Sequence, residues 1–164
     1  MNGPGLKVGL KRMTLGERVL GDAELVGCPL VRLLGPTAAQ YVLGQSTARR
    51  FVDGARLFLE GDPGDALLLV MKGDVRLWVG AGATPVEVAT AGKGEFIGEQ
   101  EALGGSTARA WSAQAVGEVE VVEIPGALVR QCAAKFPAFA DHLHTLARAR
   151  QEARSAITDF LNRW

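Results

Sequence analysis

The sequence predicts a mainly β, α+β domain in which a short helical segment precedes an antiparallel double-sheet sandwich or barrel and a long helix follows it. Three observations predict this class. Residues 49–124 carry apolar runs of four to seven residues between glycine-containing turns, which is typical of short antiparallel strands. Residues 22–48, a helical preface, carry helix start and stop signals, and from Pro137 the apolar residues recur at helical spacing. A chain of 164 residues, 48% of them hydrophobic, can form one domain with a buried core.

The chain is expected to divide into an N-terminal extension, residues 1–21, and one domain, residues 22–164. The extension mixes glycine with lysine and arginine. A solvated tail is favoured there over a docking arm, because termini are poorly ordered unless other segments hold them. The domain is expected to open with a short capped helix, Asp22 to Val26. A second helical turn, Cys28 to Leu34, precedes Gly35-Pro36.

Six short strands are expected within the β segment. Glycine and aspartate cluster at Gly61 to Asp65 and at Lys72 to Asp74, and such clusters are typical of turns that reverse the chain. The expected strands are Arg56 to Glu60, Ala66 to Met71, Asp74 to Val79, Val86 to Ala89, Arg109 to Ala115 and Val119 to Ile124.

The C-terminal segment, residues 125–164, is expected to be helical. A helix of about 26 residues from Pro137 would be about 39 Å long, which is more than a small barrel covers. We therefore expect its apolar stripe to form a homodimer interface. The stripe follows heptad spacing and consists of Phe139, Leu143, Leu146, Arg150, Ala153, Ile157, Phe160 and Trp164.

Arg150 interrupts this stripe and predicts a carboxylate partner. In a dimer the simplest partners are Asp141 or Glu152 of the partner subunit. The alternative is a helix that folds onto its own barrel as a lid, with Trp164 over the pocket.

Composition excludes several classes of function. The 18 basic and 18 acidic side chains balance, which removes the attraction that sequence-independent nucleic-acid binding needs; no direct nucleic-acid binding is expected. Cys28 and Cys132 lack metal-type spacing and indicate buried thiols in a reducing compartment. No segment reaches the ~18 apolar residues of a membrane span. We therefore expect a cytoplasmic protein.

No catalytic or metal site is evident. His142 and His144 are two residues apart on a predicted helix and point to different sides, so they do not share a metal. No serine or cysteine has an obvious neighbouring base. The chain is therefore expected not to be an enzyme and to carry neither a metal nor a covalent cofactor.

Gly98, Glu99 and Arg109 have the residue types that hold a small sugar phosphate. Gly98 lets a ligand approach the backbone, and a helical turn from Glu99 to Leu103 would direct free N–H groups at an anion. Arg109 would contact two phosphate oxygens, while Glu99 would accept from a ribose hydroxyl. One carboxylate for a sugar hydroxyl and one arginine for a phosphate with a single negative charge match a cyclic nucleotide. The alternative is a structural ion pair between Arg109 and Glu99 or Glu101.

In this order, the turn Gly61-Asp62-Pro63-Gly64-Asp65 with Gly73, the element Phe96-Ile97-Gly98-Glu99, and Arg109 resemble the cyclic nucleotide-binding domain. This family includes the catabolite activator protein and the regulatory subunits of protein kinase A. The resemblance implies a jelly-roll-like β-roll in which Glu99 holds the ribose 2′-hydroxyl and Arg109 holds the cyclic phosphate. It also implies a C-terminal helix that closes over the base and, in the bacterial regulators, forms the dimer seam.

The resemblance also suggests residues that surround these two. Gln100 and Ala110 would border the phosphate and ribose. Arg154 and Ser155 are candidates to face the base, and a solvated arginine with an incidental serine is an equal alternative. Trp111 is a possible base contact, although core packing is favoured for it. Ala110 lacks the hydroxyl that cyclic-GMP-selective members often carry, which favours cyclic AMP.

Two departures from the family pattern leave two hypotheses open. Gln100 and Glu101 replace an apolar and a small residue, which adds a charge near the phosphate, and the sequence ends at Trp164 without a helix-turn-helix. The first hypothesis is a cyclic nucleotide sensor that signals through its C-terminal helix to a separate partner protein. The second is a protein-interaction or assembly module with the same fold and a weak or empty pocket.

Overall fold

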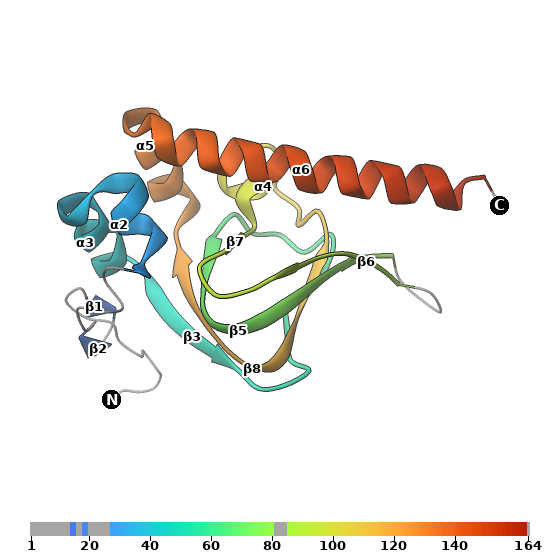
Figure 1. Ribbon diagram of the computed structural model, residues 1–164, viewed down its shortest axis with the longest axis horizontal. Helices are drawn as coiled ribbons and strands as arrows, with labels where there is room; N and C mark the ends of the chain where they lie inside the picture. The colour runs from blue at the N-terminus through green and yellow to red at the C-terminus, as the bar shows by residue number, and fades with distance from the viewer. Residues whose placement is uncertain (1–13, 16–17, 20–26, 81–84, 164) are drawn as a thin grey trace.

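A computed structural model describes residues 14–15, 18–19, 27–80 and 85–163. An antiparallel sheet curls into a roll, one helical hairpin packs at its end, and a long helix crosses over it (Figure 1). Two short strands, β1 (Thr14–Leu15) and β2 (Arg18–Val19), pair with each other before the roll. The predicted helix Asp22 to Val26 lies outside the described residues.

The helical preface contains α2 (Pro29–Leu34) and α3 (Pro36–Gly44). Each begins with a proline, which suits the first helical position because its missing N–H has no partner there. Gly35 separates the two helices at a φ of 83°, a conformation that favours glycine. The predicted helical turn that Gly35-Pro36 ends is therefore confirmed.

The main sheet has six strands, all paired antiparallel. Its order is β3-β8-β5-β6, while β4 pairs with β8 and β7 pairs with β5. The predicted antiparallel β-roll is thus confirmed. The strands are β3 (Thr47–Phe51), β4 (Arg56–Phe58), β5 (Leu67–Val79), β6 (Val86–Ala91), β7 (Phe96–Ile97) and β8 (Ser112–Ile124); the sequence did not predict β3 or β7.

In two places, two strands that the sequence predicted separately form one long strand, β5 and β8. The predicted turn at Lys72 to Asp74 is wrong: the chain continues through it as β5, and the register with β8 shifts there. Gly73 has a φ of 86°, as expected at a β-bulge that bends a strand. The predicted strand from Arg109 is also wrong at its start, because β8 begins at Ser112.

Apolar side chains fill two cores on opposite faces of the sheet. Along β5, Leu68 and Val70 belong to the core inside the roll, whereas Leu67 and Leu69 belong to the core under the helices. This alternation is the period of two that a strand imposes. Every one of the four side chains is buried.

The C-terminal helices are α5 (Gly126–Lys135) and α6 (Pro137–Leu161). In Figure 1, α6 runs across the top of the roll and α4 (Glu99–Ala102) lies between them. Contacts join α4 to both α5 and α6, and α6 also contacts α2 and β6. The predicted long C-terminal helix is confirmed, and it lies directly over the segment that carries Glu99.

Candidate functional site

Gly98 sets the geometry of the candidate site. It joins β7 to α4 with a φ of 83° and is the N-cap of α4. A Cβ at this position would lie 2.5 Å from Arg109 Nη1 and 2.9 Å from the Ala66 carbonyl oxygen. Only glycine fits both the backbone conformation and the space. We refer to residues 98–110, which run from this glycine past Arg109, as the cassette.

Arg109 is held in an irregular segment just before β8. Its N–H donates to the Asp62 carbonyl (2.9 Å) and its carbonyl accepts from the Gly61 N–H (2.8 Å). The guanidinium lies over the Phe58 ring, 4.4 Å from the centroid, which is a favourable cation–π distance. The turn at Gly61 to Asp65 therefore fixes this arginine, and the side chain is only 6% exposed.

The guanidinium of Arg109 contacts Glu101. Its Nη1 donates to Glu101 Oε1 at 3.1 Å, and the Glu101 side chain is 1% exposed. The structural ion pair considered above is therefore present, with Glu101 rather than Glu99 as the partner. The contact uses one nitrogen and one oxygen, so it is not the two-pronged geometry that a guanidinium forms with two oxygens.

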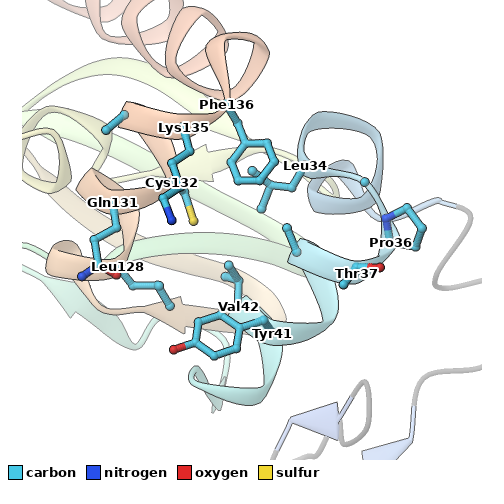
Figure 2. Close-up of a pocket in the computed structure, with 13 residues that line it drawn as sticks. Leu34, Pro36, Thr37, Tyr41, Val42, Leu128, Gln131, Cys132, Lys135 and Phe136 are labelled. Carbon is cyan, nitrogen blue, oxygen red and sulfur yellow. The ribbon is translucent and has the colours of Figure 1, made fainter.

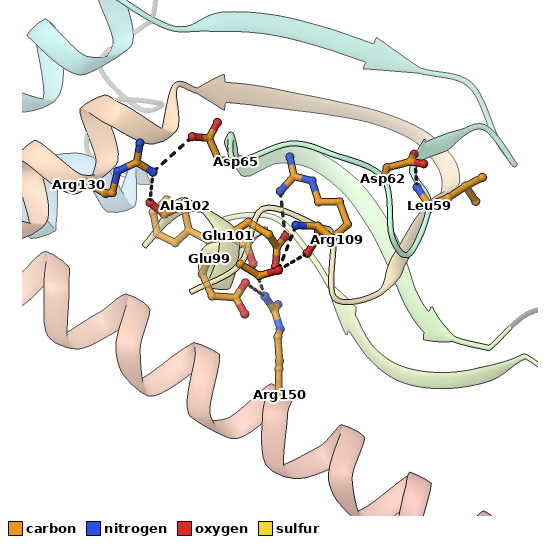
Figure 3. Close-up of polar contacts among 12 residues, drawn as sticks. Leu59, Asp62, Asp65, Glu99, Glu101, Ala102, Arg109, Arg130 and Arg150 are labelled. Atoms are coloured by element: carbon orange, nitrogen blue, oxygen red, sulfur yellow. Dashed lines mark hydrogen bonds and ion pairs between the residues drawn. The ribbon is translucent and has the colours of Figure 1, made fainter. Parts of the chain in front are cut away.

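Glu99 contacts Arg150 of α6 (Figure 3). Arg150 Nη1 donates to Glu99 Oε1 at 2.8 Å and to the Phe96 carbonyl at 2.6 Å. The expected partners of Arg150, Asp141 or Glu152 of the partner subunit, are therefore wrong: its carboxylate comes from its own chain. The break in the apolar stripe indicated an acid, but the spacing along the helix did not indicate that α4 supplies it.

The two acids of α4 each keep one oxygen without a hydrogen-bond partner. Within the described residues, Glu99 Oε2 and Glu101 Oε2 are both buried and unbonded. Burial raises the pKa of Glu99, the charge and hydrogen bond of Arg150 oppose this, and the charge of Glu101 adds to it. Buried acceptors of this kind favour a hydrogen-bond donor beside them.

Gln100, Ala110 and Arg154 also take part in contacts of the cassette with α6. Gln100 Nε2 donates to Gln151 Oε1 of α6 at 3.2 Å. Arg154 donates to the Ala110 carbonyl and, at 3.0 Å, to Glu60 Oε2. No pattern in the sequence predicted this role of Glu60.

Trp111 and Ser155 are not part of the polar cluster. Trp111 is 1% exposed and belongs to the core inside the roll, in accord with the packing role favoured from the sequence. Ser155 is exposed on α6. The structure therefore brings Gly98, Glu99, Gln100, Arg109, Ala110 and Arg154 together and leaves these two apart.

Two of the cavities in the described part of the chain lie near different parts of the fold. One of about 350 Å³ borders Arg109 and is lined by Phe58, Leu68 and the turn residues 62–66 among others. A larger one, about 860 Å³, lies between α3 and α5 and is mainly apolar, with Tyr41, Leu128 and Phe136 on its walls (Figure 2). The larger cavity contains no residue of the cassette.

The described residues contain neither a metal cluster nor a helix that could span a membrane. Among the described residues, no three His, Cys, Asp or Glu side chains are grouped as a metal site. None of the helices in the described part is both long and apolar enough to cross a membrane. Cys28 and Cys132 are buried free thiols, as the sequence predicted.

The sheet, the cassette and the covering helix define a β-roll domain with a buried polar cluster under its C-terminal helix. The family profile described as "Cyclic nucleotide-binding domain" matches residues 48–136. The chain belongs to this family.

Individual relatives agree with this assignment. The cyclic AMP receptor protein of Thermus thermophilus is 34% identical over 99 residues, which is 60% of this chain and 45% of the relative. A cAMP-dependent protein kinase regulatory subunit from Colletotrichum orbiculare is 29% identical over 115 residues, 70% of this chain and 29% of the relative. The lysophospholipase nte1 of Neurospora crassa is 36% identical over 150 residues, 89% of this chain but 10% of the relative. The chain thus spans less than half the length of each of these relatives.

A solved structure has the same fold. The Thermus thermophilus catabolite activator protein superimposes with a TM-score of 0.65 and 30% identity, covering 82% of this chain and 63% of that one.

Proposed function

We propose that this domain is a regulatory sensor that binds a cyclic nucleotide between the cassette and α6 and passes the bound state to a partner protein through α6. Membership of the family supports the class of ligand. The observation that carries the proposal is the buried hydrogen bond between Glu99 and Arg150, because it joins the acid of the cassette to the helix directly. A ligand that engages Glu99 would alter a contact that holds α6, and a difference in affinity for two helix positions is what shifts their balance.

In this proposal Arg109 binds the cyclic phosphate and Glu99 accepts from the ribose 2′-hydroxyl. Gly98 permits close approach of the ligand to the backbone, and Gln100 and Ala110 border the phosphate and ribose. Cyclic AMP is favoured over cyclic GMP because Ala110 offers no hydroxyl.

The base would face α6. Arg154 is the better supported contact, because it already reaches the cassette at the Ala110 carbonyl. Ser155 is exposed in the present position of α6 and would contact the base only if the helix moved. Trp111 would support the site by packing.

The same proposal covers the wider role of the chain. The domain would act in the cytoplasm as a homodimer, without catalysis and without direct contact to nucleic acid, and a separate protein would read its state. The two relatives that carry this domain in regulatory proteins support a non-catalytic role.

One observation favours the alternative, a protein-interaction or assembly module with a weak or empty pocket. Arg109 is already paired with a buried carboxylate, so an incoming phosphate has to compete for it. In that case the domain would bind other proteins through its surface, and a nucleotide would have no role.

Calorimetry separates the two proposals. Purified protein is titrated with cyclic AMP, cyclic GMP and cyclic di-GMP, and the sensor is expected to bind cyclic AMP most tightly. Arg109→Ala should weaken binding by about 2–5 kcal/mol, since it leaves a desolvated phosphate unpaired. Arg148→Ala, which removes an exposed arginine of α6, is the matched control and should have no effect.

Arg109→Ala also leaves Glu101 without its partner, so Arg109→Lys is measured beside it. Lysine keeps the charge but cannot reproduce the fork of the guanidinium, and we expect an intermediate affinity. Circular dichroism verifies that each variant is folded. Undiminished binding in both variants would remove Arg109 from the site, and a wild type that binds none of the three nucleotides would favour the assembly module.

A further inference from the structure

Glu101 occupies the position at Arg109 where the proposed site needs a phosphate. The carboxylate is 1% exposed, and its Oε1 lies 3.1 Å from Arg109 Nη1. It lies two residues beyond Glu99 on the single turn of α4. An anion that binds Arg109 therefore meets a negative charge that is already there.

The charges of the buried cluster balance without a ligand. Arg109 and Arg150 are opposed by Glu101 and Glu99, with one ion pair each. Without the charge of Glu101, the cluster would carry one surplus positive charge, which matches the single negative charge of a cyclic phosphate. With that charge present, phosphate binding leaves a surplus negative charge in a buried site, which is unfavourable.

The contact between Glu101 and Arg109 is one that a ligand can displace. It is a single hydrogen bond that leaves Glu101 Oε2 unbonded. A cyclic phosphate has two exocyclic oxygens and could meet the guanidinium with both, which is the stronger arrangement. The cavity of about 350 Å³ beside Arg109 leaves space around that side chain.

The other charged groups around Glu101 do not replace this pairing. Glu99 lies on the same helical turn and is paired with Arg150 of α6. From α5, Arg130 reaches α4 but donates to the Ala102 carbonyl (3.1 Å) and to Asp65 (3.4 Å). A displaced Glu101 would thus be a buried, unpaired carboxylate, and taking up a proton from solvent removes that charge.

We propose that Glu101 is an internal competitor for the ligand phosphate, so that this site takes an anionic cyclic nucleotide only together with a proton on Glu101. This inference rests on the proposed function and assigns a charge requirement to the same site. Binding moves one proton from solvent to the Glu101 carboxylate and transfers Arg109 from that carboxylate to the phosphate. The sensor then responds to nucleotide and to acid together.

Glu101→Gln tests this directly, because glutamine keeps the shape and a carbonyl acceptor for Arg109 but has no charge. At pH 8 we expect the variant to bind cyclic AMP at least about tenfold more tightly than the wild type, because displacing the uncharged glutamine leaves no buried, unpaired charge. The advantage should shrink toward pH 6, by up to about tenfold per pH unit. Glu152→Gln removes an exposed carboxylate of α6 and should leave affinity and its pH dependence unchanged.

Proton uptake gives a second measurement. Calorimetry in two buffers of different ionisation enthalpy should detect uptake of about one proton per nucleotide by the wild type and less by the Glu101→Gln variant. Comparing these two proteins separates Glu101 from Glu99, which both retain. Thermal denaturation confirms that both are folded.

The outcomes distinguish this inference from the proposed function. If the wild type binds cyclic AMP and Glu101→Gln binds it no more tightly, with the same proton uptake, the inference is overturned and the sensor proposal stands. If neither protein binds cyclic AMP or cyclic GMP, both are overturned, because freeing Arg109 should at least have produced binding.

Discussion

The two carboxylate oxygens of Glu99 differ in their hydrogen bonding. Oε1 accepts from Arg150 at 2.8 Å, while Oε2 is buried without a hydrogen bond in the described part of the chain. An unbonded buried acceptor is costly, and a ligand donor that reaches it regains that cost. Oε2 is therefore the atom that we expect a ribose hydroxyl to meet.

A 2′-deoxy nucleotide tests this assignment of Glu99. Cyclic 2′-deoxy-AMP should bind about 1.5–3 kcal/mol more weakly than cyclic AMP, the range for a hydrogen bond to a charged group. In Glu99→Gln the difference between the two ligands should shrink, because the acceptor is no longer ionised. Calorimetry measures all four combinations. Equal affinity of both ligands for the wild type would give Glu99 a purely structural role.

The pH dependence of stability also depends on Glu99. Burial raises the pKa of this acid above its ordinary value of 4.5 in the folded state, so the folded protein binds the proton more tightly than the unfolded chain does. Its contribution to the free energy of unfolding should therefore fall as pH rises from 4.5 through the raised folded pKa. Urea unfolding of the wild type and of Glu99→Gln over this range measures the contribution as a difference.

Glu118 provides a comparison of opposite sign. The hydrogen bond and charge of Lys72 lower the pKa of this exposed acid, so its contribution is present above the ordinary value and is lost as pH falls through the lowered one. The difference between wild type and Glu118→Gln should thus shrink toward low pH. A Glu99 difference with the same sign of slope would contradict the raised pKa.

Among the secondary-structure elements, the sequence predicted which segments are helices and strands better than it predicted the residues at which they begin and end. Lys72-Gly73-Asp74 has the composition of a turn, but a glycine with positive φ also suits a β-bulge, and pairing with β8 on both sides favours the continuous strand. Arg109 has an apolar neighbourhood typical of a strand, yet its backbone bonds to Gly61 and Asp62. Such long-range hydrogen bonds leave no local pattern in a sequence.

The bulge in β5 predicts a difference between two glycine variants. Gly73 and Gly54 have φ values of 86° and 82°, so alanine is strained at both. At Gly73 a Cβ would also lie 2.3 Å from the Glu118 carbonyl oxygen, whereas at Gly54 nothing lies within 4 Å. Gly73→Ala should therefore lose roughly 1–3 kcal/mol more stability than Gly54→Ala, the typical cost of forcing extra volume into a packed site. Urea denaturation measures both losses. Equal losses would contradict the prediction, because they would mean that β5 shifts to accommodate the Cβ at no loss of stability.

The polar cluster could be predicted only in part, for a related reason. Phe96-Ile97-Gly98-Glu99 and Arg109 indicated the cassette, and a basic residue in the apolar stripe of the last helix indicated a buried acid. The pairing of Arg150 with Glu99 joins residues 51 positions apart. Which acid meets which arginine depends on how α6 crosses α4, and no spacing within either segment determines that crossing.

At the scale of the whole molecule, α6 is more than a lid. Its first half is anchored in the domain by buried Phe139, Leu143 and Arg150. Its second half carries Phe160 and Leu161, which are 59% and 51% exposed; Trp164 lies outside the described residues. In Figure 1 the C-terminal end of α6 extends past the roll. The single-chain lid therefore accounts for the buried part of the predicted stripe and leaves Phe160 and Leu161 largely exposed.

We expect this second half to form a symmetric homodimer, in which the same apolar stripe serves both chains. Exposed large apolar residues close together usually mark an interface, and Ile157 is half-buried on the same helix. Light scattering should find a dimer at micromolar concentration for the wild type and a monomer for an Ile157→Asp/Phe160→Asp variant, because two charges would be buried at the seam. Thr145→Asp places a charge on an exposed position of the anchored half and should remain dimeric. A monomeric wild type would contradict the dimer, and a double variant that stays dimeric would place the interface on another surface of the domain.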